Sequence, residues 1–337
     1  MRIAVVGGGF YGCLVALRLS EVAGVTVDLF ERKHKLLSGA ISANQHRLHL
    51  GFHYPRCDET IRQAIASFDR FQSNYSMAVE DIANNIYCVH SSGAVSAEDY
   101  IRKMQQHNLS FEEVATPIAI SNAKDIAVSL RVYEKMINLS ELVRVVSSQV
   151  AASRINTLLS HDVKPQELAD KYSYVINCTY TEPGEGVGLR TKSELAIMLL
   201  ARATSDWSGR ALTIMDGPFC SIYPADNGFH TISSVVHTPA IRAASARMLE
   251  GIADSLSAEE WAELDKNILT HARELVNIDG FDIFGRYVTV KTKLEQDRND
   301  FRGTVVVQRE NIISVMAGKI SCAFLVIDDV LKKIGVE

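Results

Sequence analysis

The chain opens with alternating secondary structure that its apolar positions predict directly. Residues 3–6 form a continuous apolar run typical of a buried parallel strand, and an amphipathic run follows over residues 14–19. A second apolar run covers residues 25–30 and ends at Glu31. These segments predict a strand, a helix and a second strand at the start of the chain.

Further helices are predicted where apolar residues recur every three to four positions. Asp58, Asn138 and Ser257 each stand where a capping residue would open one of these helices. The helical segments are 58–75, 96–107, 138–151, 257–275 and 320–334. Strands are expected at 86–90, 126–137, 174–180, 215–224, 229–237, 285–292, 304–307 and 312–315. Asn227-Gly228 predicts a hairpin turn between two of them.

The composition narrows the class of protein. At 337 residues, with 47% hydrophobic and 22% charged residues, the chain fits a globular enzyme of two closely packed domains. Its net charge of -5 gives no basic surface for nucleic acid. No apolar run reaches the length of a membrane span, and a strand beginning by residue 3 leaves no room for a signal peptide, so we expect a cytoplasmic protein. The six cysteines contain no C-x-x-C pair, which indicates reduced thiols.

The turn after the first strand carries a glycine pattern, Gly7-x-Gly9-x-x-Gly12. Gly7 permits the tight turn, Gly9 lets the backbone approach a pyrophosphate, and Gly12 allows the helix to pack on the strand. Glu31 lies nineteen residues after Gly12, where an acid accepts a hydrogen bond from a ribose 2′-hydroxyl. A plain strand-turn-helix is the alternative. Because a carboxylate repels the 2′-phosphate of NADP, the motif predicts NAD or FAD.

A second informative stretch follows Glu31 and has neither helical nor strand periodicity over most of its length. Residues 46–56 contain three histidines, two arginines and a tyrosine. Long loops in compact domains are usually functional, so we expect a site beside the cofactor, although these side chains can also simply hydrogen-bond one another. Arg47 and Arg56 can hold a phosphate or carboxylate. No third ligand is placed for a metal beside His49 and His53, and no metal site is expected.

The glycine turn with Glu31, the segment from Ser38 to Arg56 and a C-terminal Gly318-Lys319 resemble the FAD-dependent oxidoreductases of the D-amino-acid oxidase and glycine oxidase superfamily. The form Asn44-x-x-Arg47-Leu48-His49-x-Gly51-x-His53-Tyr54-Pro55-x-Arg56 resembles an uncharacterised bacterial subgroup. This resemblance implies an α/β fold: a Rossmann-like three-layer FAD domain with an inserted, mostly antiparallel α+β substrate domain. The expected FAD domain is discontinuous, with residues 1–78, 138–182 and 302–337, and the substrate domain has residues 79–137 and 183–301.

The resemblance also implies contacts with FAD. In relatives, a returning strand ends in a Thr-Gly pair near the cofactor; here Thr179 is followed by Tyr180. The C-terminal helix aims its N-terminus at the pyrimidine edge of the flavin, where Gly318 and Lys319 would contact it, although Lys319 can also be an exposed lysine. The expected cofactor contacts are Gly7, Gly9, Phe10, Tyr11, Gly12, Glu31, Arg32, Ser38, Asn44, Arg47, Leu48, Thr179, Gly318, Lys319 and Ile320.

The function that follows is FAD-dependent oxidation of a small amine or hydroxy compound, often a 2-amino or 2-hydroxy acid, by hydride transfer to flavin N5. The expected catalytic residues are His49, His53, Tyr54 and Arg56, with Tyr223, Tyr287 and Lys291 at the substrate, although Tyr287 and Lys291 also fit a polar surface. Only one glycine fingerprint is present, so oxygen or another soluble compound would accept the electrons. A flavin-dependent isomerase or mutase and an NAD-dependent dehydrogenase are the alternatives.

Overall fold

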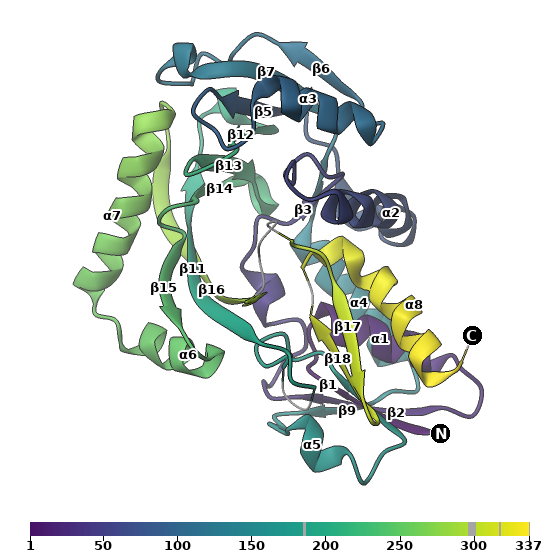
Figure 1. The fold of residues 1–337 in the computed structure, drawn as a ribbon. Coiled ribbons are helices and arrows are strands. Elements are labelled where there is room, and N and C mark those ends of the chain that lie inside the picture. Colours follow the sequence, from purple (N-terminus) through teal and green to yellow (C-terminus); the bar gives the residue numbers. More distant parts are fainter. Residues whose placement is uncertain (185–186, 296–300, 317, 337) are drawn as a thin grey trace.

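The protein contains a mostly parallel six-stranded sheet built from segments far apart in the chain (Figure 1). The computed structural model describes residues 1–184, 187–295, 301–316 and 318–336. The strand order is β17 (Val305–Arg309), β18 (Ile312–Met316), β10 (Tyr174–Asn177), β1 (Arg2–Val6), β2 (Thr26–Glu31) and β9 (Asn156–Leu159). Because β1 pairs in parallel with both β2 and β10, the residues that follow these three strands meet at one edge.

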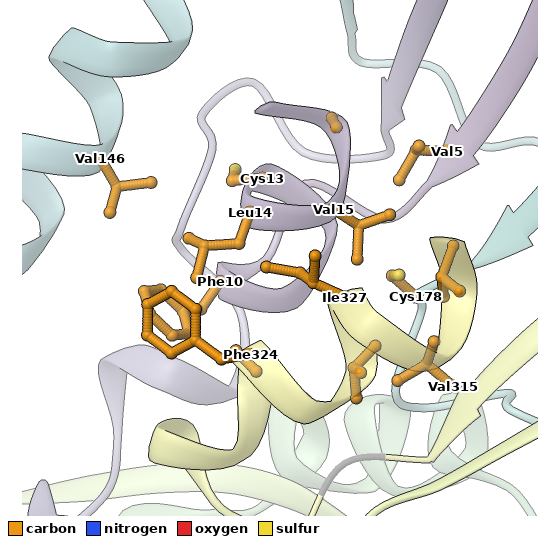
Figure 2. Packing of buried hydrophobic residues seen from close by; sticks show 14 of the residues in the cluster. Val5, Phe10, Cys13, Leu14, Val15, Val146, Cys178, Val315, Phe324 and Ile327 are labelled. Carbon is orange, nitrogen blue, oxygen red and sulfur yellow. The ribbon is translucent and has the colours of Figure 1, made fainter. Parts of the chain in front are cut away.

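Four helices bury the largest apolar cluster on one side of this sheet. They are α1 (Phe10–Ser20), α2 (Asp58–Asn74), α4 (Leu139–Ala152) and α8 (Ala323–Ile334). Of these, α1 and α8 pack on the strands, and α2 and α4 pack against these two helices. Figure 2 shows Phe10 and Leu14 of α1 lying against Phe324 and Ile327 of α8. The predicted apolar stripe of α8 is buried here, and the helix ends at Gly335, whose φ of 71° suits a glycine cap.

The opposite face of the sheet packs against a shorter segment. Leu168 of α5 (Pro165–Leu168) and Tyr172 contact Val6, Phe30 and Val175. Helices, sheet and this segment form three layers, which confirms the predicted α/β class and Rossmann-like architecture.

A second, mostly antiparallel sheet has nine strands. Its order is β15 (Pro239–Ala243), β11 (Thr191–Arg202), β14 (Phe229–Ser234), β13 (Cys220–Pro224), β12 (Arg210–Met215), β5 (Asn84–His90), β7 (Ile126–Val132) and β6 (Phe111–Val114), with β16 (Asp282–Leu294) also paired to β11. Three helices pack on it: α3 (Ala97–Gln106), α6 (Ala246–Ser255) and α7 (Ala258–Leu275).

A small third sheet joins three very short strands, β3 (Arg47–Leu48), β8 (Lys135–Ile137) and β4 (Val79–Glu80). The sequence predicted one continuous strand over residues 126–137. That prediction was wrong at Tyr133 and Glu134, where the chain leaves β7 and the carboxylate of Glu134 turns inward to accept backbone N–H groups. This break places Glu134 beside the histidine-containing loop.

Other predicted elements agree with the structure to within a few residues, with two exceptions. Cys57, and not Asp58, is the N-cap of α2, because the Asp58 carboxylate pairs with Lys103 and His107. Residues 215–224 are not one strand, since β12 ends at Met215 and β13 begins at Cys220. The boundaries of the two expected domains stay a prediction. In the described ranges, we find no helix that combines the length and the apolar character needed to cross a membrane.

Candidate active site

The turn after β1 leaves one glycine open to a ligand. Gly7 has a φ of 103°, and a Cβ there would lie 2.6 Å from the carbonyl oxygen of Cys178. A Cβ at Gly12 would lie 1.8 Å from the carbonyl oxygen of Gly7. Gly9, the N-cap of α1, faces open space, because a Cβ there would meet no atom within 4 Å. Gly7 and Gly12 therefore allow close packing, while Gly9 leaves the helix N-terminus accessible to an anion.

Glu31 ends β2 beside this turn. Its Oε2 accepts a hydrogen bond from the Gly8 N–H at 2.7 Å, and its Oε1 accepts one from the Lys33 N–H at 2.8 Å. These bonds fix the carboxylate in the wall of a cavity. The predicted acceptor for a ribose hydroxyl thus lies beside the predicted pyrophosphate site.

The cavity has a volume of about 420 Å³ and is lined by residues from both large sheets. Lys291 of β16, expected at the substrate, is among them. The expected cofactor contacts that line it are Gly7, Gly9, Phe10, Tyr11, Glu31, Arg32, Ser38, Asn44, Thr179, Gly318, Lys319 and Ile320. Gly12 and Leu48 do not line it; Gly12 packs on Gly7, and Leu48 is fully buried in the core.

Arg47 also lies outside the cavity wall, and its guanidinium is occupied by the protein. It donates to the Thr213 hydroxyl at 2.8 Å, to Tyr87 at 3.1 Å and to Gln45 at 2.9 Å. It also stacks on the Tyr223 ring, 4.1 Å from the centroid. The expectation that Arg47 holds phosphate or carboxylate is therefore corrected, because the buried guanidinium donates to protein side chains.

Six other expected site residues are not part of this cavity wall, namely His49, His53, Tyr54, Arg56, Tyr223 and Tyr287. Arg56 forms an ion pair with Asp216 at 2.7 Å. Tyr223 is fully buried and donates its hydroxyl to the Lys135 carbonyl, so it is a core residue and not a substrate contact. Tyr287 packs its ring against His46, with 6.4 Å between centroids.

Two lysines give the cavity a positive wall. Burial lowers the pKa of Lys291 to about 8, and burial lowers the pKa of Lys319 to about 8 as well. Both ammonium groups therefore remain largely protonated at neutral pH. Lys319 is 7% exposed, donates to the Arg302 carbonyl at 2.9 Å and lies over the Tyr54 ring, so the alternative of an exposed lysine is wrong.

Three expected catalytic residues, His49, His53 and Tyr54, lie together near Lys319. The ring centroids of His49, His53 and Tyr54 lie 5.2 to 5.6 Å from one another. Burial lowers the pKa of His49, and it lowers that of His53 further below its usual range. Both imidazoles are therefore neutral at pH 7 and able to accept a proton.

The sequence did not indicate Glu134, which completes this cluster. Its side chain is fully buried. Oε1 accepts from the Leu50 and Gly51 N–H groups at 2.9 and 3.2 Å, and Oε2 accepts from the Tyr87 hydroxyl at 2.7 Å. A single acid between two strands carries no pattern that could have marked it.

Comparisons with known proteins agree with this geometry. Residues 2–121 match the model of the DAO family of FAD-dependent oxidoreductases. The sequence is 28% identical to the FAD-dependent monooxygenase FPY4 of Fusarium mangiferae, over 99% of this chain and 91% of the relative.

The chain is similar to the FAD-dependent oxidoreductases of the DAO family.

Solved structures show the same fold. Glycine oxidase from Geobacillus kaustophilus superposes with a TM-score of 0.71 at 13% identity, covering 100% of this chain and 95% of that one. L-alpha-glycerophosphate oxidase from Mycoplasma pneumoniae, whose structure has FAD bound, gives a TM-score of 0.74 at 11% identity, with 100% and 95% covered.

The residues of this enzyme fit its cofactor, FAD. The open face at Gly9, the fixed carboxylate of Glu31 and the wall at Gly318–Ile320 belong to one cavity, as an elongated dinucleotide requires. Tyr180, where a glycine is usual, lines the same cavity with a φ of 63°. The backbone therefore keeps the left-handed conformation that glycine favours, and the difference from a glycine at this point is the added side chain.

Helix α6 supplies part of the cavity wall that the sequence did not indicate. Glu250, Ala253 and Asp254 line the cavity beside the end of β2. Glu250 forms a two-pronged ion pair with Arg32, and Arg247 pairs with Asp162 and Glu182 at 3.0 and 3.1 Å. These pairs hold α6 at the end of the site that contains Glu31.

Proposed function

We propose that the enzyme oxidises a small amine or hydroxy compound with a carboxylate or other anionic group, such as a 2-amino or 2-hydroxy acid. Electrons would pass through FAD to oxygen or another soluble acceptor. The observation that carries this proposal is the cationic Lys291 in the wall of a cavity that also contains the glycine turn. No ion pair of Lys291 is found within the described ranges, so its charge is available to a ligand.

In this proposal, the open N-terminus of α1 at Gly9 holds the pyrophosphate and Glu31 holds a ribose hydroxyl. Residues 318–320 would lie along the ring system. When bound, FAD supplies the two-electron acceptor that amino acid side chains lack. The name of the glycine oxidase with the same fold supports the 2-amino acid class, and that of the glycerophosphate oxidase supports an anionic hydroxy compound.

The protein would contribute orientation and proton transfer. Lys291 replaces Arg47 as the proposed partner of the substrate anion, because the guanidinium of Arg47 is already bonded. As a hydride leaves the substrate carbon, its hydroxyl proton passes to His49 or His53, and a carbonyl compound forms. An amine that binds as its free base needs no such acceptor.

The test is an anaerobic mixing experiment with the holoenzyme. Glycine, D-alanine, L-proline, L-lactate, glycolate, glycerol 3-phosphate and glucosamine are each added, and loss of the visible flavin absorbance is followed. We expect bleaching by an anionic member of the panel. Lys291→Met should then raise KM for that compound at least about tenfold with a smaller change in kcat, because one charge-assisted contact is worth about 1.5–3 kcal/mol.

Lys266→Met is the matched control, because Lys266 forms an exposed ion pair with Glu263 on α7. It should leave KM unchanged. Bleaching by glucosamine alone, or an unchanged KM in Lys291→Met, would contradict the anionic substrate.

Two other reaction types remain testable alternatives. The relative named as an FAD-dependent monooxygenase favours oxygen insertion, which transfers label from ¹⁸O₂ into the product, whereas the proposed oxidation does not. A flavin-dependent isomerase would turn over without any electron acceptor. The alternative of an NAD-dependent dehydrogenase is disfavoured, because the matching family model describes FAD-dependent oxidoreductases. A cytoplasmic location stays a prediction.

A further inference from the structure

The register of the small sheet brings Glu134 next to His49. In the antiparallel pair of β3 and β8, Arg47 lies opposite Met136 and Leu48 opposite Lys135. Continuing this register places residue 49 opposite residue 134. The Nδ1 atom of His49 accordingly lies 3.3 Å from Oε2 of Glu134.

Glu134 is held as an anion at this position. Although burial opposes its charge, His49, Tyr87 and Arg47 lower the pKa of Glu134 to about 2. Its two oxygens accept from two backbone N–H groups and from the Tyr87 hydroxyl, so the carboxylate cannot rotate away without breaking these bonds. A carboxylate without a proton can only accept from His49.

We infer that Glu134 is a positioning residue that keeps the proton of His49 on Nδ1, so that His49, and not His53, is the base that receives the substrate proton. This inference rests on the proposed oxidation of a hydroxy compound.

The contrast between the two histidines supports this assignment. With Nδ1–H donated to Glu134, the lone pair of His49 is on Nε2, and its side chain retains 13% of its surface while that of Glu134 retains none. His49 thus keeps a small accessible surface beside a fully buried carboxylate. Nδ1 of His53 is buried and finds no hydrogen-bond partner in the described part of the chain, so no contact at that atom sets its tautomer.

The charged and titratable neighbours of His49 determine the pH at which it works. Glu134 raises its pKa, while Arg47 and Lys319 join burial in lowering it. The groups that face it are Glu134 after β7, Arg47 on β3, Lys319 before α8, and His53 and Tyr54 on its own loop. Removing the charge of Glu134 must therefore move the ionisation of His49 to lower pH.

The direct test is the tautomer of His49 in the ¹⁵N-histidine-labelled holoenzyme. We expect one neutral imidazole with the proton on Nδ1, whose signals disappear in His49→Asn and persist in His53→Asn. In Glu134→Gln the side-chain amide can donate to Nδ1, so the same ring should change to the Nε2–H form.

Glu112→Gln is the matched control on exposed β6, where Glu112 pairs with Arg131. It should leave the spectrum unchanged. A His49 ring with the proton on Nε2 in the wild type would overturn the inference.

The kinetic test uses the rate of anaerobic flavin reduction by L-lactate, glycolate and glycerol 3-phosphate as a function of pH. His49→Asn should slow reduction at least about 100-fold, the usual effect of losing a general base, and His53→Asn should slow it less. Glu134→Gln should lower the plateau rate and shift the ionisation to lower pH, which a purely structural role would not do. A greater loss in His53→Asn than in His49→Asn would overturn the assignment. Unchanged rates in both would refute the proposed base itself, whatever tautomer the spectra show.

Discussion

The two glycines at positions 7 and 9 carry different constraints, and alanine at each should have a different effect. At Gly7 a methyl group meets Cys178 and the positive φ is strained, so Gly7→Ala should destabilise the apoprotein by about 1–3 kcal/mol or more. At Gly9 the space is open and φ is -73°, so the unfolding free energy should stay within about 1 kcal/mol. Gly9→Ala should instead weaken FAD binding at least about tenfold, about 1.4 kcal/mol. Urea unfolding and FAD fluorescence titration measure the two effects, and normal FAD binding by Gly9→Ala would place the pyrophosphate elsewhere.

Particular residues also show which parts of the site could not be predicted from the sequence. The glycine spacing and Glu31 are local, so their geometry could be predicted from one segment. Arg47 could not be assigned, because whether a guanidinium is free depends on Thr213, which is 166 residues away in the chain. Glu134 lies 85 residues from His49, and the strands that join them are only two and three residues long. Such short strands leave no alternating pattern in the sequence.

At the scale of elements, helix α6 is expected to slow the release of FAD. Its Glu250 lines the cavity and pairs with Arg32 at the end of β2, and both side chains are partly exposed. An exposed pair contributes about 0.2–1 kcal/mol, so Glu250→Gln should release FAD about 1.4- to fivefold faster. Salt should accelerate release from the wild type more than from the variant, because salt screens the pair. The rate is read from the rise in FAD fluorescence after dilution.

Glu263→Gln is the control for this helix, since Glu263 also forms a carboxylate pair but on the exposed side of α7. Equal release rates in Glu250→Gln and wild type would show that the pair between Glu250 and Arg32 does not slow the release of FAD. The stripes of α7 and α8 could be predicted from the sequence because each helix packs one apolar face against a core. The contact of α6 with the cofactor cavity was not readable, because it depends on how the two sheets are arranged.

At the scale of the whole molecule, the cavity wall combines residues that follow β1 and β2 with residues of β16 and α6. A ligand that fills the cavity should therefore stabilise both sheets together. At about a hundred times its dissociation constant FAD adds about 2.7 kcal/mol, which corresponds to a rise in Tm of about 4 °C for a chain of this length. ADP at the same concentration contains only the half that Glu31 and Gly9 would bind, so it should raise Tm less. Glu31→Gln should reduce the shift from both ligands and leave any shift from FMN, which lacks the adenosine, unchanged. A Tm shift from ADP as large as that from FAD would mean that the flavin half does not contact residues 318–320 or β16, and the proposed placement of the ring system would be wrong.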